Sequence, residues 1–218
     1  GGSFLYHLDN NQVAVGFVIG LDYKNPFLSP FEEFQKFKTH PDICKTFEKG
    51  RRISYGARAI SEGGYQSIPR LSFPGGLLIG DTAGFLNVPK IKGSHAAMKS
   101  GIVAAESLIN AIKSTDTRAS LDYTYRLSKS WLWAELKQVR NIRPSFKWGF
   151  WIGMIYSAID TYMLRGKAPW TLKHHEDHKQ LIPANKAKKI DYPKPDGILT
   201  FDRLSSVFIS NTNHEENQ

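Results

Sequence analysis

Residues 77–84 read Leu-Leu-Ile-Gly-Asp-Thr-Ala-Gly, and this stretch decides the fold. The three apolar residues at its start suit a short buried strand, and the Gly-Asp pair places a carboxylate just beyond the strand's end. The loop over residues 84–89 then leads to a segment from Ser94 to Ile112 whose apolar residues recur at helical spacing. This order brings the carboxylate to the edge of a sheet where α/β folds bind ligands.

The start of the predicted helix carries chemistry of its own. Its first amides, near Gly93, Ser94 and His95, lack partners within the helix, and together with the helix dipole they favour negative charge. A reduced flavin carries such charge over N1 and the C2 carbonyl, and a polyol chain can donate hydrogen bonds to Asp81. However, a Gly-Asp pair is commonly only a turn, and Gly93 equally permits two backbones to pack closely. A flavin site and an ordinary turn therefore both stay open.

Local patterns predict the elements on either side. Aromatic and β-branched residues over Ser3–Leu8 and Gln12–Leu21, separated by Asp9-Asn10-Asn11, predict a β-hairpin. Ser29 caps a predicted helix over Pro30–Lys38, with Pro at its first position. Weaker patterns predict a helix over Asp42–Glu48, a strand over Arg52–Ile60, a helix over Leu121–Val139 and a strand over Ile198–Phe201.

The positive charge of the chain is concentrated next to an apolar run. The net charge is +9 over 218 residues, and residues 136–175 hold seven Lys and Arg side chains against Asp160 alone. Inside this stretch, residues 148–159 carry no charge, but twelve residues are too few for the roughly 20 that span a bilayer. Helical spacing relates the predicted membrane-facing residues Trp148, Trp151, Ile152, Ile155 and Ile159. A helix lying on an anionic membrane surface and a core helix both fit this pattern, and nucleic acid is not expected as a partner.

The remaining polar residues give weaker signals. A single cysteine, Cys44, excludes an internal disulfide and any multi-cysteine metal site made by this chain alone. His174, His175 and His178 lie in a polar run and suit either a metal site or a solvated surface. His7 suits a structural hydrogen bond or a proton relay. No set of nucleophile, base and orienting residue stands out in the sequence.

Residues 80–101 closely resemble the second flavin-binding segment of the electron transfer flavoprotein-ubiquinone oxidoreductase family. Further shared strings fall at residues 1–7, 20–23, 55–58, 139–144 and 169–174. The resemblance implies an oxidoreductase that takes electrons from electron transfer flavoprotein and passes them to ubiquinone, using FAD and one 4Fe-4S cluster. It also implies the matrix face of the mitochondrial inner membrane as the location.

The same resemblance assigns roles to individual residues. It implies that Asp81, after Gly80, contacts the ribityl or pyrophosphate region of FAD, and that Asn87 lies near the isoalloxazine edge. It puts the stretch Gly93–His95, with Ser94 at its centre, near the pyrimidine side of the flavin. Gly1 and Gly2 match a pair that contacts ubiquinone through backbone groups, although the bare sequence also fits a turn before a strand.

The implied fold is α+β: part of a glutathione-reductase-type FAD domain with an inserted quinone-binding sheet-and-helix domain and a monotopic membrane helix. We expect quinone domain over residues 1–70, FAD domain over 71–115, a helical membrane-facing region over 116–175 and a linker over 176–218. The chain begins without Met and lacks both a Gly-x-Gly-x-x-Gly turn and the four cysteines of a cluster, which predicts an internal fragment that is inactive alone. The alternatives are a related FAD-dependent reductase, such as a geranylgeranyl-reductase-like protein, and, for the isolated chain, a membrane-binding module without catalysis.

Overall fold

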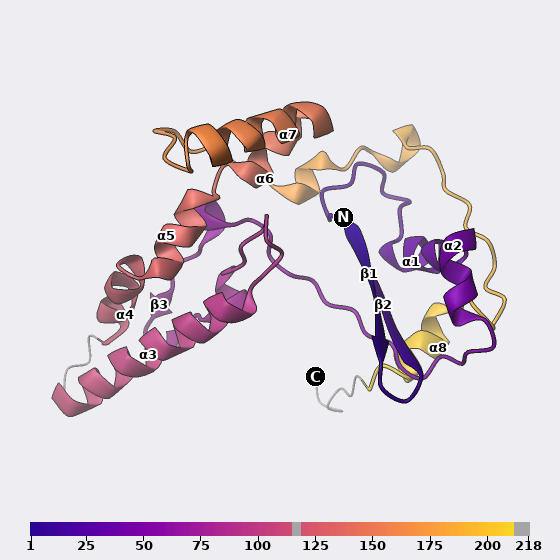
Figure 1. The fold of residues 1–218 in the computed structure, drawn as a ribbon, viewed down its shortest axis with the longest axis horizontal. Helices are drawn as coiled ribbons and strands as arrows, with labels where there is room; N and C mark the ends of the chain where they lie inside the picture. The colour runs from indigo at the N-terminus through magenta and orange to yellow at the C-terminus, as the bar shows by residue number, and fades with distance from the viewer. Residues whose placement is uncertain (115–118, 212–218) are drawn as a thin grey trace. The chain divides into compact units, whose positions relative to one another are not determined.

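The computed structural model describes residues 1–114 and 119–211 and divides the chain into two compact units (Figure 1). The hairpin unit contains residues 1–58 together with 175–211, and the helical unit contains residues 59–174. Helices and short strands occur together, which is compatible with the predicted α+β class. The predicted domain boundaries were drawn by expected function and stay predictions. They include residues 115–118 and 212–218, which lie outside the described residues.

The hairpin unit begins with the antiparallel pair β1 (Gly2–Leu8) and β2 (Gln12–Val18). Asn10 and Asn11 have φ values of 58° and 54°, a left-handed conformation that asparagine tolerates in tight turns. The predicted hairpin is therefore confirmed, although β2 ends three residues early. One face of the hairpin packs on α1 (Pro30–Lys38), where the rings of Phe17 and Phe37 stack with their centroids 5.0 Å apart.

Helix α1 has the predicted bounds because its capping residues are local. The Ser29 hydroxyl accepts the N–H of Glu32, and Pro30 occupies the first helical position. Helix α2 (Pro41–Cys44) and the 3₁₀ turn that follows it (Lys45–Phe47) take the place of the predicted helix over residues 42–48.

The segment after His175 packs against α1 within the hairpin unit. The Tyr192 hydroxyl donates to Glu33, and the side-chain oxygen Oε1 of Gln35 accepts the N–H of Phe201. The predicted strand over 198–201 is wrong, because the Asp196 carboxylate accepts three successive backbone N–H groups and curls the chain instead. Helix α8 (Arg203–Phe208) follows.

The predicted strand over residues 52–60 is also wrong. A strand needs a hydrogen-bonded neighbour, and within the described residues β1 and β2 pair only with each other. Arg52 instead donates to the hydroxyls of Ser205 and Ser206.

The helical unit begins with two strands of two residues each, β3 (Ser72–Phe73) and β4 (Gly76–Leu77). The predicted buried strand over residues 77–79 thus shrinks to β4, because Leu77 and Leu78 are half-buried and Ile79 is exposed. After a 3₁₀ turn over Gly80–Ala83, helix α3 (Ser94–Ser114) confirms the helical pattern that predicted it.

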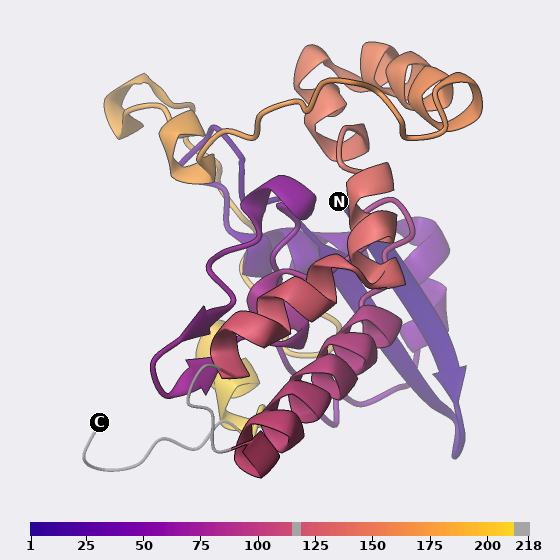
Figure 2. The ribbon, with the colours of Figure 1, turned by 90° about the vertical axis from the view of Figure 1, so that its left-hand side faces the viewer.

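Two helices, α4 (Ala119–Ser128) and α5 (Trp131–Gln138), replace the single helix predicted over residues 121–139. Ser130 is extended, so the chain turns between them. This turn lets both helices bury apolar side chains against α3, which lies along α4 (Figure 2). The largest buried apolar side chains of this core are Phe85, Tyr123, Leu127, Leu132 and Leu136.

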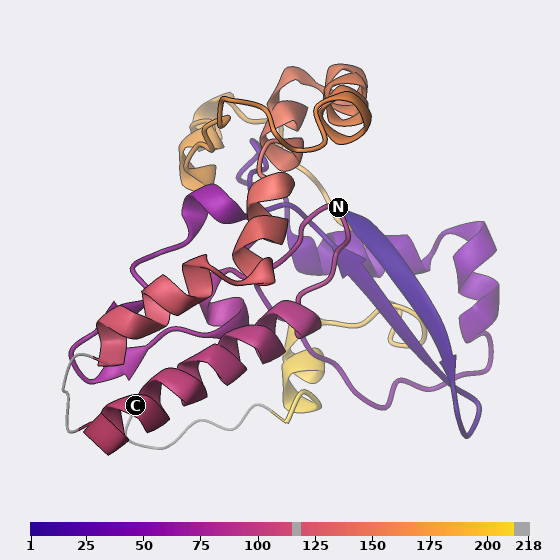
Figure 3. The same cartoon turned by 60° about the vertical axis from the view of Figure 1, so that its left-hand side comes forward.

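The helical unit ends with α6 (Ile142–Ser145), α7 (Phe150–Ala158) and a π-helical turn over Ile159–Met163 (Figure 3). Helix α7 approaches the preceding turn through Gly153. A Cβ built on Gly153 would lie 2.7 Å from the Phe146 ring and 3.0 Å from its Cα, so only glycine permits this contact.

Candidate functional site

The segment that opened the sequence forms a turn held against α3. The Gly80 N–H donates to the Ser100 hydroxyl of α3 at 2.9 Å, and Gly84 ends the 3₁₀ turn with a left-handed φ of 75°. Gly80 is buried and the Asp81 side chain is exposed. The Gly-Asp pair therefore directs a carboxylate into solvent beside the face of α3.

The loop that follows closes on itself just before α3. Asn87 and Lys92 form an antiparallel bridge, and the Lys90 N–H donates to the Asn87 carboxamide. A Cβ on Gly93 would lie 3.2 Å from the Leu86 side chain, so the backbone passes close to the core here. Ser94 is exposed and His95 is half-buried at the start of the helix. All six predicted flavin-facing residues thus lie on one continuous turn, loop and helix start.

Asn87 does not present its side chain to a ligand in this arrangement. Its side chain is 1% exposed, and its amide nitrogen donates to Glu135 Oε1 at 2.6 Å. Asn87 therefore shapes the loop from inside. Its predicted contact with the isoalloxazine edge stays a prediction.

Glu135, on α5, joins the loop to the start of α3. Its Oε1 also lies 3.1 Å from Lys90 Nζ and 3.1 Å from His95 Nε2. Burial raises the pKa of Glu135, but the hydrogen bonds from Asn87, His95 and Lys90 and the charge of Lys90 outweigh it, so the pKa lies below its usual value. Sequence reasoning missed Glu135, because nothing in the pattern of α5 links it to a loop more than 40 residues earlier.

The predicted quinone pair lies at the beginning of β1. Both glycines are exposed, and a Cβ on Gly1 would lie 2.6 Å from the Val18 carbonyl oxygen, while one on Gly2 would meet nothing within 4 Å. His7 is exposed on the same strand. The outer face of the hairpin is apolar, since Phe4, Tyr6 and Leu8 are 42%, 60% and 52% exposed.

The predicted membrane-facing residues all lie at the surface of the helical unit. Trp148 and Ile159 are 42% and 41% exposed at the two ends, and Trp151 reaches 77%. Ile152 and Ile155 are 57% and 63% exposed. Helix α7 buries only Gly153 within its bounds. The apolar run is therefore a surface helix in this structure rather than a core helix.

The basic residues around this helix divide into two groups. The Arg140 side chain is buried and donates to backbone carbonyls, and Arg143 forms an ion pair with Glu62 at 3.5 Å. Lys147 lies over the Trp148 ring, with its nitrogen 5.2 Å from the ring centroid. Two of the seven cations counted in the sequence thus serve the fold, and the exposed members are Lys137, Lys147, Arg165, Lys167 and Lys173.

Among the residues that the structure describes, no helix combines the length and the apolar character needed to cross a bilayer.

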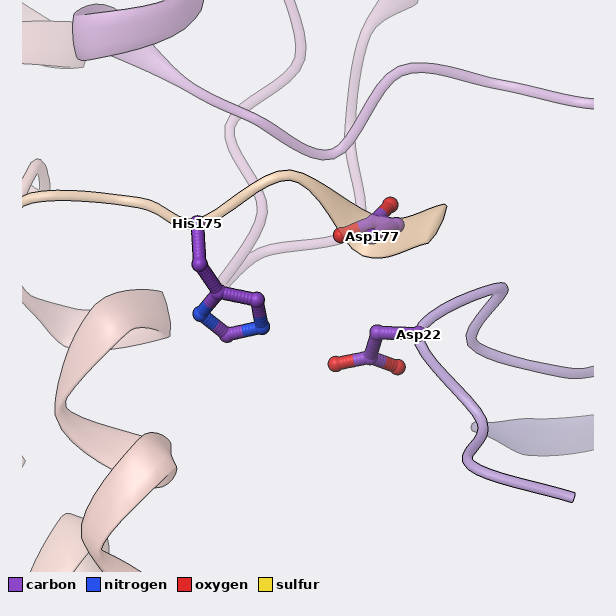
Figure 4. Close-up of side chains that lie close together, drawn as sticks. All are labelled: Asp22, His175 and Asp177. Carbon is purple, nitrogen blue, oxygen red and sulfur yellow. The ribbon is translucent and has the colours of Figure 1, made fainter. Parts of the chain in front are cut away.

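One mixed group of possible metal ligands lies in the hairpin unit (Figure 4). Single ligand atoms of Asp22, His175 and Asp177 all lie within 4.8 Å of one another. His178 instead lies 3.8 Å from Glu176. The histidine run predicted from sequence therefore does not converge, and its one contribution to this group is His175, at a solvated surface.

Known proteins resemble this chain over its whole length. Residues 1–60 match the family model described as "ETF-QO, ubiquinone-binding". All of the chain aligns with proteins named electron transfer flavoprotein-ubiquinone oxidoreductase, mitochondrial, at 56% identity in Homo sapiens, 57% in Mus musculus and 52% in Dictyostelium discoideum. The chain spans 37% of the length of the first two relatives and 38% of the third.

Proposed function

We propose that this chain supplies the ubiquinone-binding and membrane-facing part of an enzyme. The chain is a member of the electron transfer flavoprotein-ubiquinone oxidoreductase family. The enzyme would pass electrons from reduced electron transfer flavoprotein to ubiquinone. The observation that carries the proposal is the identity of more than half of all 218 residues with relatives of that name. The match of residues 1–60 to a ubiquinone-binding family model supports the quinone as acceptor.

The turn, loop and helix start over residues 80–95 have the chemistry to face FAD. When bound, FAD supplies a centre that takes up and gives away electrons. The 21-residue helix α3 offers free amides and the positive end of its dipole, and the Lys90 ammonium, which has N–H groups besides the one that bonds Glu135, adds donors beside them. This donor set fits the negatively charged pyrimidine edge of a reduced flavin, and the exposed Asp81 carboxylate fits a ribityl hydroxyl.

These residues do not provide the ligands that a 4Fe-4S cluster needs. Such a cluster takes four thiolates, whereas the chain holds Cys44 alone. We therefore assign no step through a cluster to this chain, and its ligands would come from outside these 218 residues.

The exposed apolar face of α7 supports a monotopic contact with the matrix face of the mitochondrial inner membrane. Tryptophan rings and lysine side chains are both satisfied at the level of the lipid headgroups. Trp151 and Ile155 are largely exposed on α7, and Lys147 lies over the Trp148 ring on the preceding turn. Ubiquinone is itself confined to the bilayer, so an enzyme that reduces it gains from lying on that surface.

Liposome flotation tests this contact. The intact enzyme carrying Trp148→Asp, Trp151→Asp and Ile155→Asp should no longer float with cardiolipin-containing liposomes, because charges on the inserted face oppose burial in lipid. A matched control replaces the exposed Leu204 and Phe208 of the hairpin unit by Asp and should float normally. Unchanged flotation of the α7 variant, with its circular dichroism intact, would refute the proposal.

Electron transfer is tested on the same intact enzyme. Reduced electron transfer flavoprotein should reduce ubiquinone in its presence, and the enzyme should show flavin absorbance. Failure to couple the two substrates would favour a related FAD-dependent reductase.

A second role fits the chain by itself, because α7 needs no cofactor to be apolar and exposed. Recombinant residues 1–218 that bind cardiolipin vesicles without flavin absorbance would identify a membrane-binding module.

A further inference from the structure

One oxygen of Glu135 accepts hydrogen bonds from three side chains that lie on two different segments. Asn87 and Lys90 lie on the loop, and His95 lies in the first turn of α3. The donors stand 2.6, 3.1 and 3.1 Å from Oε1, and the Glu135 side chain is 19% exposed.

The geometry also fixes the imidazole of His95. An ionised carboxylate only accepts hydrogen bonds, so the proton of the ring lies on Nε2 when that atom bonds Glu135. The ring of Trp131, one turn before Glu135 on the same helix, stacks on His95 with centroids 5.7 Å apart and an interplanar angle of 8°. Helix α5 therefore sets both the ring plane and the tautomer of His95.

The charges in this cluster nearly cancel. The Glu135 carboxylate faces the Lys90 ammonium, whose side chain is 60% exposed. The carboxylate also lies near the start of α3, where the helix dipole by itself favours negative charge. Removing the carboxylate would leave a lysine cation and the helix dipole acting together on whatever faces them.

We propose that Glu135 is the positioning residue of the flavin-facing edge. Glu135 holds the loop against α3, orients His95 and balances the charge of Lys90. This inference rests on the proposed function, because it takes the flavin to face residues 80–95. It assigns Glu135 no contact with the flavin itself. Its two separable consequences are the geometry of the loop and the electrostatic potential at the flavin.

Two substitutions in the full-length, FAD-loaded enzyme separate these consequences. Glu135→Gln keeps the shape and removes the negative charge, so the reduction potential of the flavin should shift to a more positive value. Glu135→Asp keeps the charge but is one methylene shorter and loses contacts. The dissociation constant for FAD should then rise about 10-fold, because part of the binding free energy is spent on ordering the loop that Glu135 no longer holds. Glu106→Gln removes the same charge from an exposed site farther along α3 and should change neither quantity.

The readouts are spectroelectrochemical titration of the flavin and fluorescence of released FAD. An unshifted potential in Glu135→Gln together with unchanged FAD affinity in Glu135→Asp would overturn the role of Glu135 and leave the proposed function standing. A wild-type enzyme that holds no FAD would instead overturn the proposed function. If Glu135→Gln does not fold, the exposed Lys90→Gln serves in its place. It should shift the potential in the negative direction, and an unshifted potential would again count against the inference.

Discussion

Replacing Arg140 by Lys should destabilise the helical unit more than any conservative exchange on its surface. All five N–H groups of the Arg140 guanidinium donate hydrogen bonds, and the side chain is 7% exposed. The acceptors are the carbonyl oxygens of Lys137, Gly166, Ala168 and Trp170 and the hydroxyl of Thr171. The guanidinium thus connects the segment after α7, which holds four of these acceptors, to the end of α5.

The magnitude follows from counting donors. A lysine ammonium has three N–H groups at one point, so at least two of the five hydrogen bonds are lost. Each hydrogen bond to a charged group contributes about 1.5–3 kcal/mol, so the free energy of unfolding should fall by about 3–6 kcal/mol. That is a large share of the ~5–15 kcal/mol that holds a typical domain together.

Urea denaturation of the chain, followed by circular dichroism, measures this loss. Hydrogen exchange should also quicken at the amides of Gly166 and Leu172, which are bonded in the same segment. Lys137→Ala removes a neighbouring exposed cation and should change the free energy of unfolding by less than about 0.5 kcal/mol. An Arg140→Lys protein within about 0.5 kcal/mol of the wild type would refute the reasoning.

Three further changes test other parts of the structure. Leu132→Ala opens a cavity at a fully buried site and should cost about 2–5 kcal/mol in urea unfolding, and a cost below 1 kcal/mol would contradict the core described above. Gly153→Ala places a methyl group 2.7 Å from the Phe146 ring and should cost about 1–3 kcal/mol, seen as a lower melting temperature, whereas an unchanged one would mean that α7 is not packed there. Burial and the nearby Arg52 lower the pKa of Lys38 to about 8, although Asp196 opposes them. The unfolded chain keeps this proton up to about pH 10.5, so the cost of burying the charge is present below pH 8 and fades as pH rises toward 10.5. The free energy of unfolding should therefore rise by about 1–2 kcal/mol between pH 7.5 and 9.5, allowing for screening at the partly solvated ammonium, and Lys38→Met should abolish the rise. A variant that keeps the rise would rule out Lys38 as its source.

Local signals predicted those elements whose capping or turn residues are adjacent in the chain. Helix α1 has its predicted bounds because Ser29 and Pro30 act within one turn, and the β1–β2 hairpin forms because Asn10 and Asn11 tolerate left-handed backbone. The strands predicted over residues 52–60 and 198–201 failed for a common reason. A strand depends on a partner, and the pattern of a single segment does not reveal whether a partner exists.

The candidate site divides in the same way. The turn, loop and helix start over residues 80–95 were recognisable from residue types and spacing, since each of their contacts with α3 lies within about 20 residues. Glu135 was not, because its hydrogen bonds join residues 40 to 48 positions apart. The apolar run before Asp160 was equally visible, but the sequence left a core helix and a surface helix both open.

The sequence by itself determined the hairpin, helices α1 and α3, the twelve-residue apolar run and the resemblance to a flavin- and quinone-dependent family, because all of these depend on neighbouring residues or on shared strings. The tertiary structure alone decided that α7 is exposed, that Arg140 turns inward and that Glu135 joins a loop to a helix start. These outcomes depend on which distant segments meet. The buried cation of Arg140 and the partly buried carboxylate of Glu135 are stabilised because acceptors or donors from those segments converge on them.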